Sequence, residues 1–294
     1  MHETDALHRF LFEKLNIRGQ LVRLDQSWRT VLERREYPPA VRQILGDTLA
    51  ATALLGATLK FTGRLIVQLQ SSGPLHMVVA QYSHDGKLRG LARWHGSIGA
   101  QQTLPELCPD GTLVATVEPA RNAFRQEPYQ GIVSLQGLSV AAALERYFDQ
   151  SEQLPTRLKL ASNDSTAAGL LLQRMPGLAP DPDGWERVQQ LGSTLTEPEL
   201  LTLDATRVLQ RLFHQETVRL FEPASLAFAC TCSRERTAAM LQALGQDEVH
   251  DIVREQGAVS ITCEFCGMSH TFDAVDAASL FTEVGPLDSN ATRH

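Results

Sequence analysis

The first apolar residues of the chain alternate with polar ones, a pattern typical of strands that bury one face. Two such runs lie at residues 9–12 and 20–24. Between Pro38 and Lys60 the apolar residues instead recur every three or four positions, and Gly63 follows. This period predicts a long helix whose apolar and small-residue side is buried on a sheet.

The strands of that sheet are expected in the stretch that follows. The strand-like runs are residues 65–69, 77–81, 88–94, 112–118, 131–136, 157–160 and 169–172. Short turns such as Asp85-Gly86 join several of these runs, so we expect neighbouring strands to be antiparallel. Ser139 is placed to cap a helix that extends to Phe148. Residues 1–178 are therefore predicted to form an α+β core, in which an antiparallel sheet packs with helices.

Turn-forming residues between Pro176 and Gly184 mark the end of this core. Three short amphipathic segments follow: one begins at Trp185, one carries a capping box that starts at Thr196, and one is capped by Asp204. Isolated helices shorter than about 12–15 residues are marginal in water, so these segments can persist only while docked on something else. We predict that residues 179–229 form a metastable helical linker. An ordinary helical connector is the simpler alternative.

The last part of the chain, residues 230–294, is predicted to be a separate small domain. Ser233 is a natural cap for a helix that ends at Gly245, and a second short helix ends near Gly257. Strands are expected at residues 259–262 and 268–272. Large apolar side chains are few in this region, so its fold is expected to depend on a bound metal.

The composition is typical of an ordinary soluble protein, since 43% of the 294 residues are hydrophobic and 21% are charged. The first five residues contain neither a basic segment nor an apolar one, so we expect no signal peptide. The longest uncharged run has 12 residues, which is too short to cross a membrane. These features predict a cytoplasmic protein without a membrane partner, in a compartment that keeps thiols reduced.

Charge is concentrated near the C-terminus and argues against nucleic acid as a partner. From Ser225 onward four basic residues stand against ten acidic ones, a net of −6 out of −7 for the whole chain. Domains that bind nucleic acid need a positive face to neutralise phosphates. We therefore expect no nucleic-acid partner.

Four of the five cysteines form two close pairs in the last quarter of the chain. Cys230 and Cys232 are separated by one residue, and Cys263 and Cys266 follow after a gap of 30 residues. Each pair offers two thiolates from one bend, the pattern of a tetrahedral zinc site with one Zn²⁺ per chain. A functional thiol site, an inert zinc ribbon, and disulfides within or across the pairs all remain open on spacing alone.

Residues next to the two pairs are expected to support the thiolates. Gly267 directly follows the second pair and would allow a turn tight enough for backbone N–H groups to point at the sulfurs. Arg234 and Arg236 lie beside the first pair, and their positive charges are expected to help hold the thiolate form.

Other candidate chemistry is weak. The sequence has no glycine-rich phosphate loop, no nucleophile elbow and no His-Glu-x-x-His helix, so we expect no enzymatic activity. Cys108 has no motif around it and is interpreted as a structural or incidental thiol. His250 and His270 are not expected to be ligands, because four cysteines already complete a structural zinc site.

Three segments together carry a resemblance to a known family. They are Cys-Thr-Cys-Ser-Arg-Glu-Arg at residues 230–236, Cys-Glu-Phe-Cys-Gly at 263–267, and Gln-Ser-Glu-Gln at 150–153 within the run from Tyr147 to Thr156. In this pattern, and in length and order, the whole chain resembles the redox-regulated chaperones of the heat-shock protein 33 family.

The resemblance implies a cytoplasmic holdase that works without ATP and binds unfolding proteins under oxidative stress. It implies an inactive state that is reduced and zinc-bound. Oxidation would then form disulfides of the Cys230–Cys232 and Cys263–Cys266 type, release zinc, loosen the linker and give an active homodimer. The alternative is a zinc-ribbon binding module or a metal-dependent enzyme in which the zinc is static.

Overall fold

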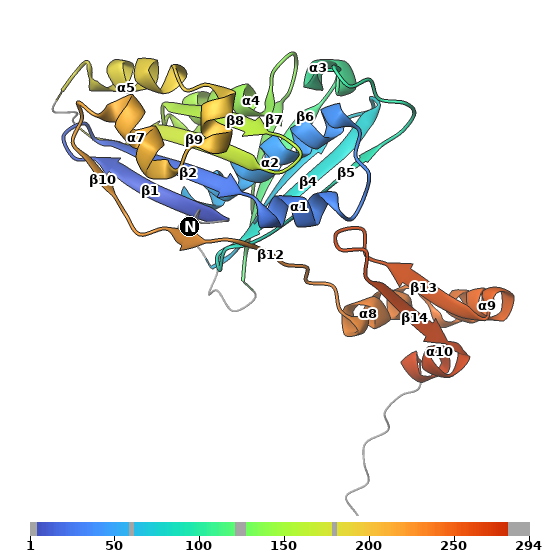
Figure 1. Cartoon of the computed structure of the whole chain (residues 1–294). Helices are drawn as coiled ribbons and strands as arrows, with labels where there is room; N and C mark the ends of the chain where they lie inside the picture. Colours follow the sequence, from blue (N-terminus) through green and yellow to red (C-terminus); the bar gives the residue numbers. More distant parts are fainter. Residues whose placement is uncertain (1–4, 59–61, 121–127, 178–180, 282–294) are drawn as a thin grey trace, which may run out of the picture. The chain divides into compact units, whose positions relative to one another are not determined.

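The computed structural model describes residues 5–58, 62–120, 128–177 and 181–281 (Figure 1). The chain divides into two compact units, the first ending at Ala229 and the second beginning at Cys230. The first unit contains two six-stranded sheets, and the second contains a two-stranded hairpin. None of the described helices is both long enough and apolar enough to cross a membrane.

The first sheet has the strand order β10-β1-β2-β9-β8, and β11 also pairs with β1. Its strands are β1 (Ala6–Phe12), β2 (Ile17–Leu24), β8 (Thr156–Ser162), β9 (Ala167–Arg174), β10 (Val218–Leu220) and β11 (Ala224–Ser225). All of its pairings are antiparallel.

The second sheet has the order β12-β5-β4-β3-β6-β7. Its strands are β3 (Gly63–Gln70), β4 (Leu75–Ser83), β5 (Lys87–Trp94), β6 (Thr112–Pro119), β7 (Tyr129–Ser134) and β12 (Ala227–Phe228). Gly86 forms the predicted tight turn between β4 and β5 with a φ of +77°, a backbone conformation that favours glycine. Neighbouring strands are antiparallel as expected, except that the short β12 lies parallel to β5.

Helix α2 (Pro39–Thr58) packs against both sheets (Figure 1). It contacts β2, β8 and β9 of the first sheet and β3, β4 and β5 of the second. The expectation that it buries one side on a single sheet was therefore incomplete. Small residues allow this double contact: an added Cβ at Gly46 or Gly56 would collide with Ser162 or Tyr82. The predicted end of this helix at Lys60 lies outside the described residues.

The remaining helices of this core lie around the two sheets. They are α1 (Gln26–Leu32), α3 (Leu104–Leu107), α4 (Val140–Tyr147) and a π-helix, η1 (Phe148–Glu152). Ser139 caps α4 as predicted, since its side chain accepts a hydrogen bond from the Ala142 backbone N–H. Helices α1 and α3 were not predicted from the sequence, because they are short and lack a sustained apolar period.

The helices of the linker region are α5 (Gly184–Ser193), α6 (Glu197–Thr202) and α7 (Ala205–Phe213). Thr196 forms the predicted capping box with Glu199, and Asp204 caps α7. Their apolar side chains, including Val188, Leu212 and Phe213, share a core with Phe10 and other residues of the first sheet. The prediction that these helices dock on the core is thus confirmed. Whether residues 179–229 behave as a separate metastable segment stays a prediction.

Side-chain alternation explains how the first sheet serves two cores. In β9, Leu171 points into the core around α2, whereas Leu170 and Leu172 belong to the core under the linker helices. Successive side chains of a strand face opposite sides, so a sheet with apolar residues on both faces must be covered twice. The linker helices provide the second cover.

The second unit is small. It contains α8 (Arg234–Leu244), α9 (Gln246–Gln256), β13 (Ala258–Thr262), β14 (Ser269–Asp273) and α10 (Ala274–Leu280). Ser233 caps α8 as predicted, through a bond from the Arg236 backbone N–H. Helix α10 was missed, although Asp273 and Asp276 form a capping box that signals it. Its buried core consists of Leu241, Val249, Val259, Phe272 and Ala277.

Candidate metal centre

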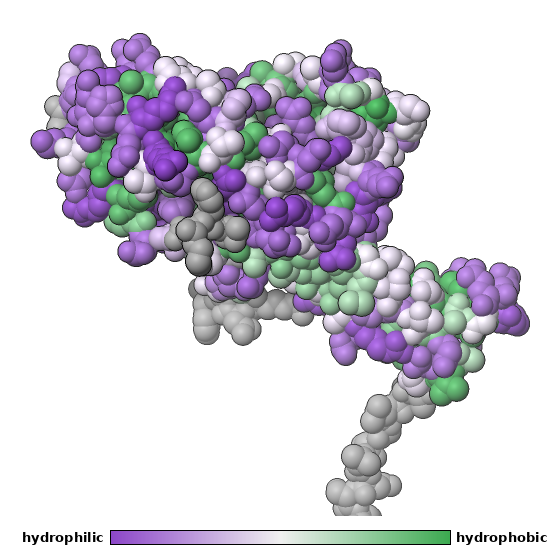
Figure 2. All heavy atoms as spheres, viewed as in Figure 1, coloured by the Kyte–Doolittle hydropathy of each residue, from purple (hydrophilic) through white to green (hydrophobic). Residues whose placement is uncertain are grey.

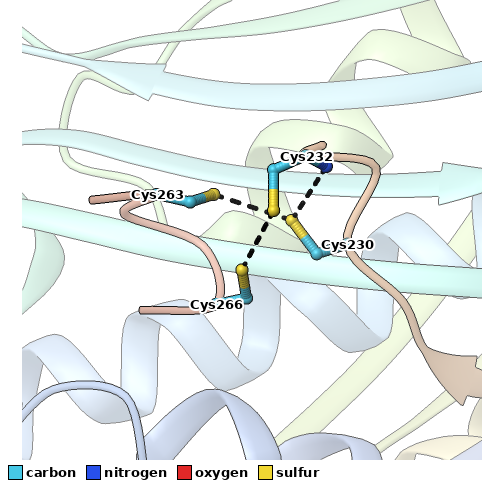
Figure 3. A group of neighbouring side chains, drawn as sticks. All are labelled: Cys230, Cys232, Cys263 and Cys266. Carbon is cyan, nitrogen blue, oxygen red and sulfur yellow. Dashed lines mark hydrogen bonds between the residues drawn. The ribbon is translucent and has the colours of Figure 1, made fainter. Parts of the chain in front are cut away.

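The four cysteines predicted from spacing meet in the second unit (Figure 3). Cys230 and Cys232 lie in the segment that precedes α8, and Cys263 and Cys266 lie in the turn between β13 and β14. Their four Sγ atoms all lie within 4.8 Å of one another. The Sγ–Sγ distances are 3.6 Å between Cys230 and Cys263 and 3.3 Å between Cys232 and Cys266.

The hairpin holds its two cysteines in a tight turn. The Cys263 backbone N–H donates to the Met268 carbonyl at 2.9 Å, and the Gly267 N–H donates to the Cys263 carbonyl at 2.7 Å. Gly267 has a φ of +71°, which explains the glycine at this position. We expected its N–H to point at a sulfur; instead it closes the turn, and the backbone of Met268 bonds the Cys266 sulfur.

The first pair is held by the beginning of α8. The Cys232 backbone N–H donates to the Cys230 sulfur at 3.5 Å, within the range for a sulfur acceptor. Arg236 donates from Nη1 to the Thr231 carbonyl at 2.6 Å, which ties the residue between the two cysteines to the helix. Local bonds thus hold both cysteines of this pair on one side of the bend.

The pKa values of Cys230, Cys232 and Cys266 are shifted in different directions. Burial raises the pKa of the Cys230 thiol, but bonds from the Cys232 N–H and the neighbouring thiols outweigh burial and bring this pKa down to about 7. Burial, followed by the neighbouring thiols, raises the pKa of Cys232. Burial also raises the pKa of Cys266. The Cys230 thiol is therefore more readily ionised than the thiols of Cys232 and Cys266.

Arg234 and Arg236, the two arginines that follow the Cys230–Cys232 pair, bond to backbone carbonyls and to a carboxylate. Arg234 pairs with Asp276 at 2.7 Å, donates to the Thr271 carbonyl at 2.7 Å and lies over the Phe272 ring. Its charge is therefore matched by a carboxylate, and it joins α8 to β14 and α10. The expectation that these cations hold the thiolates is not supported, because neither arginine has a described bond to a sulfur.

Four sulfur donors gathered at one point suit a soft or borderline metal ion, and a closed set of four cysteines is the donor set of structural zinc sites. Among the described residues, no histidine or carboxylate joins this group. His250 instead packs its ring edge-on against Phe281.

Cys108 belongs to the first unit and is not part of the cysteine cluster. It is buried, its Sγ donates to the Leu75 carbonyl at 3.1 Å, and burial raises its pKa to about 11. A thiol that is buried and protonated at neutral pH is chemically inert. This placement agrees with the interpretation of Cys108 as a structural thiol.

Comparison with known proteins gives one consistent family. A family model described as "Hsp33 protein" matches residues 5–273. The 33 kDa chaperonin of Nitrosococcus oceani is 48% identical over 294 residues, and the match covers all of both chains. The 33 kDa chaperonin of Pseudomonas aeruginosa is 45% identical over 301 residues, again across both full lengths.

A solved structure agrees in fold. The crystal structure of a 33 kDa chaperonin (heat shock protein 33 homolog) from Thermotoga maritima matches with a TM-score of 0.82. The match covers 94% of this chain and 97% of that one at 21% identity, so it concerns the fold alone. The full-length relatives carry the name of a chaperone, a class of protein that is not enzymatic. The chain therefore belongs to the Hsp33 family of chaperones.

Proposed function

We propose that this protein is a redox-regulated holdase that binds unfolding proteins during oxidative stress without using ATP. The proposal rests on one observation. The Sγ atoms of four cysteines lie within 4.8 Å of one another, in a unit with a very small apolar core. The reduced, zinc-bound form is inactive, and oxidation of the cysteines activates it. Cys230, Cys232, Cys263 and Cys266 are the ligands and the redox-active residues.

The redox step is simple thiol chemistry. Two thiols and one molecule of hydrogen peroxide give one disulfide and two molecules of water, through a sulfenic acid on the thiolate that is attacked first. When bound, zinc supplies Lewis acidity that keeps all four sulfurs deprotonated at neutral pH. Sulfurs that have joined in disulfides no longer serve as ligands.

Loss of the ligands should unfold the second unit. Among its described residues, only five apolar side chains are buried in its core. Such small cores rarely support a fold alone, and a structural metal site contributes on the order of 10–16 kcal/mol in zinc-finger peptides. The unit is thus a sensor whose folding depends on the oxidation state of its cysteines.

The chain itself connects this sensor to the linker helices. Strand β12 ends two residues before Cys230, and β10 and β11 pair with β1 between α7 and β12. These strands are only two or three residues long, so few hydrogen bonds hold them. Unfolding of the second unit would free the end of this segment and weaken the support of α5, α6 and α7.

The linker helices are suited to release. Between the first sheet and helices α6 and α7 lies a cleft of about 430 Å³, so their packing on the sheet is incomplete. Polar contacts at the edges hold the helices in place, including Arg23 Nη1 to the Leu201 carbonyl at 2.5 Å and Arg187 to Glu216 at 2.7 Å. Release would expose the shared core around Phe213, an apolar surface of the kind that binds unfolded chains.

In the docked state that surface is covered, and the visible face of the first unit is mainly polar with scattered apolar patches (Figure 2). The same surface, once exposed, is the proposed site for a second copy of the chain, which gives a homodimer on activation. We place the protein in the cytoplasm, where reduced thiols are maintained and oxidation is a signal of stress.

Light scattering from a heat-denatured client protein tests this proposal. The protein is added reduced or pre-oxidised with peroxide at elevated temperature, without nucleotide. Suppression of aggregation only after oxidation supports the holdase. A Cys108→Ala variant should behave like the unmodified protein, and a Cys263→Ser variant should lose the redox dependence.

The competing function is a binding module or enzyme with a static zinc. In that case reduced and oxidised protein would leave client aggregation equally unaffected. That result would reject the redox-regulated holdase.

A further inference from the structure

The Gln-Ser-Glu-Gln segment, which contributes to the family resemblance, has no part in the thiol chemistry. In the structure its first three residues lie in η1, and Gln153 ends this π-helix with a φ of +55°. A π-helix and a non-glycine residue with positive φ are both uncommon, and such strain often occurs at binding sites. The segment borders a pocket of the first unit.

This pocket has a volume of about 410 Å³, within the range of ligand pockets. Both sheets, the end of α2, and the α4–η1 segment contribute to it. Most of its wall is apolar and includes Leu55, Leu65, Val117, Leu144 and Leu154. Leu65 and Leu144 are 2% and 1% exposed.

One cation faces this apolar space. Arg18 of β2 lines the pocket and is half-buried, and its Nε and Nη2 donate to Gln173 Oε1 at 2.9 and 2.5 Å. A guanidinium has five N–H donors, so these two bonds leave the others without a partner among the described residues. No described carboxylate pairs with Arg18. Burial lowers the pKa of Arg18, since removal from water disfavours the charged form.

Three other polar residues that line the pocket, Tyr129, Tyr147 and Glu152, are hydrogen-bonded to one another. Tyr147 donates to Glu152 Oε1 at 2.6 Å, and Tyr129 bonds the Tyr147 hydroxyl at 2.7 Å. Glu152 and Tyr129 are exposed, so this hydrogen-bonded group marks the mouth of the pocket. The π-helix is what brings Glu152 to the two tyrosines.

We propose that this pocket binds a monocarboxylate with an apolar tail, such as a medium-chain fatty acid, with the carboxylate on Arg18 and the tail among the leucines. A guanidinium pairs well with a carboxylate, and that pairing is stronger where water is excluded. A polypeptide fits less well, because its backbone N–H and C=O groups would find few partners on these walls. This site is separate from the thiol switch, and its failure would leave the proposed holdase function untouched.

Calorimetric titration of the reduced, full-length protein with decanoate below its micelle concentration tests the site. We expect saturable binding with one decanoate per chain. Affinity should rise about fourfold with each methylene from hexanoate to decanoate. Decylammonium, which has a similar tail and the opposite charge, should bind at least tenfold more weakly.

Variants locate the site. Arg18→Gln should weaken decanoate binding at least tenfold, whereas Arg29→Gln, at an exposed arginine outside the pocket, should leave it unchanged. Ala115→Phe adds a ring to the pocket wall and should abolish binding. Circular dichroism checks that the variants fold. If Ala115→Phe does not fold, Arg18→Gln alone tests the site.

Equal binding of decanoate and decylammonium, or unchanged affinity in Arg18→Gln, would overturn the proposal. So would binding of an apolar peptide at this pocket that decanoate does not displace, since the site would then belong to polypeptides.

Discussion

The sulfur of Cys232 lies 3.3 Å from the sulfur of Cys266, a residue that follows it by 34 positions. Together with the 3.6 Å contact between Cys230 and Cys263, this places the short sulfur contacts across the two pairs. The order in which disulfides form therefore depends on how easily each backbone segment bends.

We predict that the Cys263–Cys266 disulfide forms before the Cys230–Cys232 disulfide. The first lies in an existing turn closed by the Gly267 N–H, whereas in an extended strand the Cα atoms of Cys230 and Cys232 would be roughly 6.6 Å apart, near the upper limit for a disulfide. Mass spectrometry of time-quenched, alkylated samples measures this order. Early accumulation of Cys230–Cys232 alone, or of a cross-pair disulfide such as Cys232–Cys266, would contradict it.

We expect the purified reduced protein to contain one zinc per chain and to release it on treatment with peroxide. Four thiolates complete a closed tetrahedral site, and oxidised sulfurs are no longer ligands. A metal-sensitive dye measures release, and thiol counting follows oxidation in the same sample. Zinc that stays bound after the four thiols are oxidised, or a reduced protein without zinc, would refute the site. Cys108→Ala should leave the stoichiometry unchanged.

Weakening the linker without touching a cysteine should activate the protein. Leu212 and Phe213 belong to α7, and each is only 2% exposed. Changing both to Asp buries charge among apolar side chains, so it should destabilise the docked helices by at least about 3 kcal/mol. The variant is expected to suppress client aggregation while reduced and zinc-loaded. Gln210→Asp, on the exposed side of α7, is the matched control and should stay inactive.

Amide hydrogen exchange separates exposure from activity in this experiment. Residues 185–213 should lose protection in the double variant and in the oxidised protein, and keep it in Gln210→Asp. A double variant that loosens in this segment yet remains inactive when reduced would mean that linker release is not the activating step. The client site would then depend more directly on the cysteine unit.

Stability should fall as pH rises from about 4 to about 7, because of Asp47 in α2. Burial is the main reason that the pKa of Asp47 is raised to about 7, and Glu197 of α6 adds to it, against a hydrogen bond from Ser162. The folded state therefore keeps a proton that the unfolded chain releases in this window, and rising pH favours unfolding. Urea unfolding of the reduced protein at pH 5 and pH 8 should show a difference that Asp47→Asn reduces. An equal pH dependence in the variant would exclude Asp47 as its source.

Local sequence determined much of this structure, because the relevant hydrogen bonds join residues close in the chain. Ser233, Thr196 and Asp204 cap helices through bonds to backbone groups three residues away, so their positions could be predicted. The turn at Gly86 likewise depends only on its neighbours. The cysteine spacing was sufficient to select the four sulfurs that meet, since each pair needs only one bend.

Tertiary structure decided what depends on distant partners. The strands divide into two sheets around α2, and the strands β10, β11 and β12 exist only because β1 and β5 offer edges to pair with. Arg234 was expected to stabilise the thiolates, but it forms an ion pair with Asp276, which is 42 residues away in the sequence. Arg18 lies in a strand whose alternating sequence pattern does not predict a pocket. The pocket beside Arg18 forms only because η1 and the second sheet lie next to this strand in the folded chain. Long-range pairing of this kind leaves no periodic signal in sequence, because its energy comes from surfaces that meet only when the chain is folded.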